Sequence, residues 1–108
     1  MAFESELRTE DTTAFIIAKG ELDANAAPEF RTQIETAAES ALSKLVLDLR
    51  ELSYMASAGL RTLVFARQKM GSDVDIYVVG AQDAVRETIE MTGVHHSVDM
   101  VDDYSGIA

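Results

Sequence analysis

A serine between a predicted strand and a predicted helix is the side chain of this sequence best placed for chemistry. The apolar run of residues 45–49, interrupted only by Asp48, predicts a central strand covered on both faces. Downstream, Leu60 and Val64 follow helical spacing, and Ser57 is a residue type that commonly caps a helix start. Unpaired N–H groups and the positive dipole end at such a start favour negative charge. A phosphate on the Ser57 hydroxyl would therefore be stabilised.

Nucleophilic catalysis is the first alternative for this serine, because G-x-S-x-G marks the nucleophile elbow of α/β-hydrolases. Met55 stands where that sharp turn needs its first glycine. The only histidines, His95 and His96, lie far downstream, and no serine–histidine–aspartate geometry follows from their spacing. Adjacent histidines point in different directions on a helix or strand, so we expect no shared metal. The sequence predicts no catalytic residue and no metal site.

Other chemistry-bearing patterns are missing from the sequence. Neither G-x-x-x-x-G-K-[ST] nor G-x-G-x-x-G occurs, so the backbone cradle that grips nucleotide phosphates is not encoded. The carboxylates are spread singly along the chain, without a pair poised for acid–base catalysis. The absence of cysteine excludes disulfides and thiolate chemistry. We expect a protein that is not an enzyme and needs no cofactor.

Charge and length restrict the partners of this chain. With 19 acidic against 9 basic side chains the net charge is −10, which repels a polyanion, and the basic residues are scattered. We therefore expect no direct contact with nucleic acid. The N-terminus is acidic where a secretory signal is basic, and no apolar run approaches the roughly 20 residues that span a bilayer. These features predict a cytoplasmic protein without membrane contact, whose surplus acid serves solubility or attraction to a basic surface.

The first half of the chain predicts a hairpin followed by a helix. Residues 3–8 alternate in polarity and pair, we expect, with a second strand near residues 13–19 as an antiparallel hairpin. Asn25 is the expected cap of the first helix, and Pro28 is tolerated because it falls in the opening turn. The inner face of this helix is predicted to carry Ala27, Phe30, Ile34, Ala37, Ala38 and Ala41.

Strands and helices alternate through the rest of the chain. The helix that begins at Ser57 is expected to end near Gly71, and residues 74–79 form another apolar strand. Residues 82–92 predict a third helix, followed by a short strand near residues 98–101. Such alternation implies right-handed crossovers onto a largely parallel sheet. The predicted fold class is α/β, with a mixed, mostly parallel sheet, a leading antiparallel hairpin and about four helices.

The predicted topology brings two loops to one edge of the sheet. In open α/β sheets, function tends to lie beyond the carboxyl ends of the strands. Ser57 follows one such strand, and residues 20–25 lead from the second strand into the first helix. This segment is expected to bring Asp23 near the same edge as Ser57.

Two motifs at this edge resemble those of a known family. Residues 48–60, DLRELSYMASAGL, resemble the signature of STAS-domain anti-sigma factor antagonists, and residues 20–23, GELD, resemble that family's second motif at the expected distance upstream. The order of elements also agrees over essentially the whole chain. The resemblance implies a single STAS-like domain that covers residues 1–108.

The resemblance also implies a mechanism. Ser57 matches the family's phosphoacceptor, which is modified by a serine kinase that is itself the anti-sigma factor. Unphosphorylated protein would bind this kinase and free the sigma factor, phosphorylation would release it, and a PP2C-type phosphatase would restore binding. One departure stands at Ala56, where the family often has Asp. This alanine removes a negative neighbour that would oppose a phosphate.

A partner-binding edge around Ser57 is a further implication of the resemblance. Within it, Gly59 would allow close packing and Leu60 would belong to the core. STAS domains also serve as unphosphorylated scaffold subunits of a transporter or another signalling assembly, and in that alternative Ser57 is only a helix cap. The residues implied to line or support the edge are Asp23, Met55, Ala56, Ala58, Gly59, Leu60 and Arg61.

Overall fold

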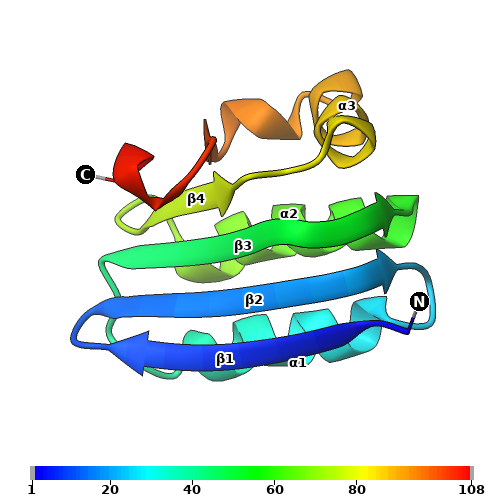
Figure 1. The fold of residues 1–108 in the computed structure, drawn as a ribbon. Coiled ribbons are helices and arrows are strands. Elements are labelled where there is room, and N and C mark those ends of the chain that lie inside the picture. Colours follow the sequence, from blue (N-terminus) through cyan, green and yellow to red (C-terminus); the bar gives the residue numbers. More distant parts are fainter. Residues whose placement is uncertain (1, 108) are drawn as a thin grey trace.

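A five-stranded sheet forms the centre of the molecule in the computed structural model, which describes residues 2–107 (Figure 1). The strands lie in the order β1-β2-β3-β4-β5; β1 is antiparallel to β2, and the other neighbours are parallel. The predicted mixed, mostly parallel sheet with a leading hairpin is confirmed. The strands are β1 (Glu4–Glu10), β2 (Thr13–Leu22), β3 (Lys44–Met55), β4 (Asp75–Val79) and β5 (Asp99–Val101).

Helices cover one face of this sheet, where α1 and α2 lie side by side behind the strands in Figure 1. The described residues form three α-helices and two 3-10 turns, one α-helix fewer than the predicted count of about four. Gly71 ends α2 as expected. The helices are α1 (Ala27–Ala37), α2 (Ser57–Met70) and α3 (Asp83–Met91), and the 3-10 turns are Val94–His96 and Tyr104–Gly106.

The main core lies between the sheet and these helices. Residues 45–49 are all buried, as the apolar run predicted, because β3 has a neighbour on each side and cover on both faces. Leu60, Leu63 and Val64 all lie in α2, as their helical spacing predicted, but only Leu60 and Leu63 enter this core, whereas Val64 is 43% exposed. The core residues of α1 and α3 are Ala27, Phe30, Ile34, Ala37, Val85 and Ile89.

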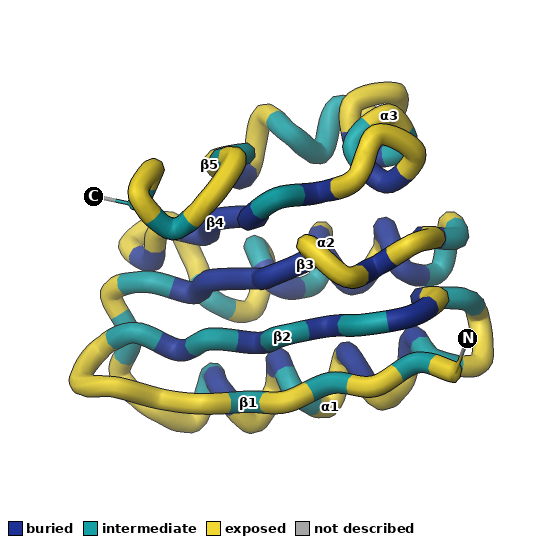
Figure 2. The backbone as a smooth tube through the Cα atoms, in the orientation of Figure 1, coloured by how far each residue is buried: buried dark blue, intermediate teal, exposed yellow. Residues whose placement is uncertain are grey.

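Among the described residues, no α-helix lies on the opposite face of the sheet, which the C-terminal segment covers in part. Val46, Tyr77 and Val79 form a second apolar cluster there, against which Tyr104 and Ile107 pack. Figure 2 shows buried backbone along the middle of the sheet and exposed backbone along β1. The C-terminal segment thus closes the part of this face that lies over β3 and β4.

Strand β3 is longer than predicted. The sequence indicated a strand over residues 45–49, but β3 continues to Met55, so only Ala56 separates it from α2. The second half pairs with β2 alone, since β4 ends opposite Asp48. A register irregularity near Gly20 accompanies this extension, and its φ of 90° is a conformation that glycine adopts without strain.

The N-cap residues of α1 and α2 both differ from those expected. Ala26, not Asn25, is the N-cap of α1, and the Asp23 carboxylate accepts a hydrogen bond from the Ala26 N–H at 2.9 Å. At the other end of α1, Ala38 is partly buried and Ala41 is exposed beyond the helix, so only the first four predicted face residues belong to the core.

Within residues 2–107, no helix combines the length and the apolar character needed to cross a bilayer.

Candidate functional site

Ser57 lies at the carboxyl edge of the sheet, as the first residue of α2. Ala56 precedes it as the N-cap, with extended backbone (φ −82°, ψ 171°). The expected capping role of Ser57 is therefore wrong, because the N-cap lies one residue earlier. The Ala56 N–H donates to the carbonyl of Leu22 at 2.9 Å, which joins the ends of β2 and β3. The Ser57 side chain is exposed and makes no hydrogen bond to a described residue. Its hydroxyl is therefore free to react or to contact a partner.

The start of α2 is electrostatically uncompensated. Its first turn contains no acidic residue, and no side chain caps it within the described part of the chain. Basic side chains, Arg67 and Lys69, lie in the last turn, where they complement the negative end of the dipole. An anion on the Ser57 oxygen would meet the free N–H groups of the first turn without a competing carboxylate.

Asp23 lies at the same edge, because β2 and β3 run parallel and Leu22 pairs with Met55. Its carboxylate is half-buried and turned toward its own loop, where it accepts from the Ala26 N–H. The Asp23 carbonyl also accepts from the N–H of Ala27 at 3.0 Å. Asp23 thus shapes the entry to α1.

The other members of the predicted edge divide by exposure. Arg61 is exposed, and Ala56 and Ala58 are partly exposed, so these three can touch a partner. The side chains of Met55, 3% exposed, and Leu60, 7% exposed, belong to the core. These two residues can support the edge from below but do not present their side chains to a partner.

Gly59 lies where α2 packs tightly against the ends of β2 and β3. A Cβ atom at this position would lie 2.9 Å from Leu22 Cγ and 3.0 Å from Met55 Cγ. Both neighbours are buried, so neither can move aside freely. Glycine at this position lets the first turn of α2, and with it Ser57, lie close against the ends of β2 and β3.

Gly59→Ala is expected to destabilise the protein by about 1 kcal/mol, because overpacking outweighs the better helix propensity of alanine. Chemical denaturation of wild type and variant measures the difference. Ala58→Gly, at the partly exposed neighbouring position, is the control for the change in propensity alone. A Gly59→Ala variant more stable than wild type would contradict the close packing described here.

A groove runs between the starts of α1 and α2, next to Ser57. Its volume is about 280 Å³. Arg61 lies on its α2 side, and Arg31 lies on its α1 side with its guanidinium carbon 4.1 Å from the centre of the Phe65 ring. The lining residues are Ala24, Ala27, Pro28, Arg31, Ala58, Arg61 and Thr62.

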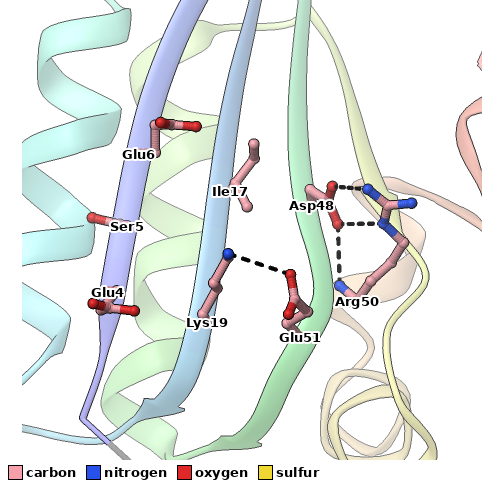
Figure 3. A pocket seen from close by; sticks show the side chains of 8 residues that line it. All are labelled: Glu4, Ser5, Glu6, Ile17, Lys19, Asp48, Arg50 and Glu51. Atoms are coloured by element: carbon pink, nitrogen blue, oxygen red, sulfur yellow. Dashed lines mark hydrogen bonds and ion pairs between the residues drawn. The ribbon is translucent and has the colours of Figure 1, made fainter.

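A buried ionic cluster on the helix-free face was not recognised in the sequence. Asp48 is 2% exposed, and its carboxylate accepts from Arg50 Nη2 at 2.7 Å and from Arg50 Nε at 3.0 Å (Figure 3). The Tyr104 hydroxyl donates to the same carboxylate at 2.6 Å. This cluster fastens the C-terminal segment to β3. The spacing Asp48-x-Arg50 was the available signal, because residues two apart share one face of a strand.

Both basic side chains that line the hollow beside this cluster are paired with carboxylates. The hollow has a volume of about 310 Å³ and opens over β1, β2 and β3. Lys19 lies 3.5 Å from a Glu51 carboxylate oxygen, and Arg50 is bound to Asp48 (Figure 3). The lining residues are Glu4, Ser5, Glu6, Ile17, Lys19, Asp48, Arg50 and Glu51.

The cluster shifts the pKa of each of its members. Burial alone would raise the pKa of the Asp48 carboxyl, but the hydrogen bonds from Arg50 and Tyr104 and the Arg50 charge outweigh burial and lower it. Burial, the hydrogen bond to Asp48 and the Asp48 charge raise the pKa of Tyr104 to about 12. The neutral phenol and the ionised carboxylate are therefore the forms that stabilise the fold.

Tyr104 is expected to stabilise the protein below about pH 10 and to lose that contribution as the pH rises toward 12. Above about pH 10 the unfolded phenol ionises, whereas the folded phenol keeps its proton. The difference in Tm between wild type and Tyr104→Phe should be constant near neutrality and shrink in alkali. Tyr54 and Tyr77 are present in both proteins, so any contribution from them cancels in the difference in Tm. A difference that stays constant beyond about pH 11 would contradict the raised pKa.

The two histidines lie together in the 3-10 turn after α3. The ring centroids of His95 and His96 are 4.0 Å apart, so the expectation that the rings point in different directions is wrong. The 3-10 conformation turns both rings to the same side. Among residues 2–107, no group of three or more histidine, cysteine or carboxylate side chains could hold a metal ion.

Comparison with known proteins assigns the chain to a family. Residues 4–106 match the family model of the STAS domain, so the chain belongs to the STAS domain family. Anti-sigma-B factor antagonists of Staphylococcus aureus are 26% identical over 95 residues, which cover 87% of this chain and 88% of theirs. The resemblance drawn from the two motifs is confirmed.

Solved structures show the same fold. An anti-sigma factor antagonist from Mycobacterium paratuberculosis superposes with a TM-score of 0.88 at 23% identity and covers 96% of this chain and 89% of its own. The anti-sigma factor antagonist SpoIIAA in its unphosphorylated form gives 0.83 at 20% identity, with coverages of 96% and 93%. The Bacillus cell fate determinant SpoIIAA in the phosphorylated form gives 0.73 at 21% identity, with coverages of 98% and 96%.

Proposed function

We propose that this chain is an anti-sigma factor antagonist, a cytoplasmic binding switch controlled by phosphorylation of Ser57. The unphosphorylated protein binds an anti-sigma factor that is also a serine kinase, and the sigma factor is released. Phosphorylation ends this binding, and a PP2C-type phosphatase restores it. The protein itself catalyses no reaction and carries no cofactor. The exposed, unbonded hydroxyl of Ser57 at the start of α2 is the observation that supports this proposal most directly.

A phosphate on Ser57 could act without a change of fold. The first turn of α2 offers N–H groups and the positive end of its dipole, and it holds no carboxylate. Phosphorylation adds about two negative charges to a surface that had presented a neutral hydroxyl. Like-charge repulsion and desolvation at the interface then oppose the partner. The names of the curated relatives and the solved phosphorylated form of SpoIIAA support the same function.

The partner-binding surface that we propose consists of Ser57 and its exposed neighbours. Arg61 follows one turn along α2, Ala56 and Ala58 flank the serine, and Asp23 reaches the same edge from β2. Met55, Gly59 and Leu60 hold this surface in place from the core.

Affinity capture from native lysate with ATP present tests the proposal. Wild type should recover an ATP-binding serine kinase, Ser57→Asp should lose it, and recovered wild type should carry phosphate on Ser57. Equal recovery of an assembly by both proteins, with Ser57 unmodified, would instead favour the scaffold function, in which the same edge docks a constant partner.

A further inference from the structure

The groove between α1 and α2 differs in charge from other hollows of the surface. Three other hollows are lined by two or more carboxylates each. The α1–α2 groove has none, and its only charged side chains are those of Arg31 and Arg61. In a chain with a net charge of −10, such a site is locally cationic.

Neither arginine of the groove has a carboxylate partner within residues 2–107. Arg31 lies over the Phe65 ring, and Arg61 is exposed without an ion pair or hydrogen bond. Arg50 and Arg86, by contrast, contact the carboxylates of Asp48 and Asp102. The ring holds Arg31 in place while leaving its N–H donors free for an external acceptor.

We propose that this groove receives an acidic side chain of the protein partner. This inference rests on the proposed function for the identity of the partner, an anti-sigma factor. Two guanidinium groups match a carboxylate in charge and in hydrogen-bond geometry. The small side chains of Ala24, Ala27 and Ala58, which line the groove, leave room for an Asp or Glu side chain to enter.

The position of Arg61 links the groove to Ser57. Residues four apart on a helix are neighbours on one face, so a phosphate on Ser57 lies within reach of Arg61. The phosphate would offset the charge of Arg61 and repel a carboxylate in the groove. Phosphorylation therefore removes an anchor for the partner and also adds repulsion.

A capped tetrapeptide of alternating Asp and Glu tests the groove without any assumption about the partner. At low ionic strength, titration should give saturable NMR shifts of the Arg31 and Arg61 side-chain N–H groups, and a matched Asn/Gln peptide should give none. Arg61→Gln should weaken binding about fivefold or more. Lys69→Gln, which removes an exposed cation at the far end of α2, should leave it unchanged.

Capture of the anti-sigma factor provides the second arm. Arg61→Glu should reduce capture at least about tenfold relative to wild type, and Lys69→Glu should not. Equal capture by wild type and Arg61→Glu would overturn the groove as the anchor while leaving the proposed function standing. If wild type captures no anti-sigma factor, the proposed function fails, and the peptide titration still decides whether the groove binds carboxylates. Absent or Arg61-independent shifts would overturn the inference.

Discussion

Phosphorylation of Ser57 is expected to weaken binding of the anti-sigma factor by about a hundredfold or more, because about two charges enter a surface that accepts a neutral hydroxyl. Ser57→Asp carries one charge and should weaken binding by at least about tenfold. An acidic residue in the first turn suits the helix dipole, so the Tm of this variant should match that of wild type. Calorimetric titration and thermal melts measure the two effects separately.

Two control variants isolate the effect of charge at Ser57. Ser57→Ala removes the hydroxyl without adding charge and should keep affinity within a few-fold of wild type. Ser72→Asp adds the same charge in the exposed loop after the far end of α2 and should change neither property. If Ser72→Asp weakened binding as much as Ser57→Asp, general repulsion from an acidic chain would explain the loss, and the local switch would be wrong.

Asp48→Ala is expected to lower the free energy of unfolding by about 2–3 kcal/mol. The substitution removes a buried carboxylate that accepts from Arg50 and Tyr104, and it leaves a cavity beneath the C-terminal segment. Arg50 is half-exposed and can turn to water, so the loss falls mainly on the attachment of Tyr104. Hydrogen exchange of residues 102–107 should accelerate with the loss of stability.

Glu10→Ala provides the matched comparison for Asp48→Ala. Glu10 also pairs with an arginine, Arg8, at 3.4 Å, but both side chains are more than half exposed. Such a surface pair contributes little, and denaturation should barely change. Equal effects of the two variants would contradict the assignment of Asp48 as a buried anchor.

The location of the site could be predicted from the sequence because it follows from topology. Parallel strands end at one edge, so the loops after residues 13–19 and 45–49 had to meet, and Asp23 lies beside the start of α2 as expected. The burial of Phe30, Ile34, Val85 and Ile89 follows from helical periodicity in the same way.

The second half of β3 could not be recognised from its pattern. Here β4 has ended and only β2 pairs with β3, so the side chains of Arg50, Glu51 and Tyr54 are exposed. In sequence, such a polar stretch resembles a loop. Polar residues therefore occupy positions that still carry strand hydrogen bonds. The position of a strand end depends on its neighbours, which local composition does not contain.

The N-caps were predicted wrongly and the Asp48 cluster was not predicted, for different reasons. Ser57 and Asn25 have the residue types of good caps, but the N-cap of each helix lies one residue away, at Ala56 and Ala26. Asp48 and Arg50 share a face through their spacing, whereas Tyr104 comes from 56 residues further along the chain. A contact of that range has no local signal in a single sequence.

Reaction of the purified complex with ATP tests the central claim most directly. Wild type bound to its captured anti-sigma kinase should dissociate as a single phosphate appears on Ser57, and treatment with a PP2C-type phosphatase should restore the complex. The Ser57→Ala complex should stay intact under the same conditions. A wild-type complex that persists with ATP, or one that dissociates without phosphate on Ser57, would contradict the switch.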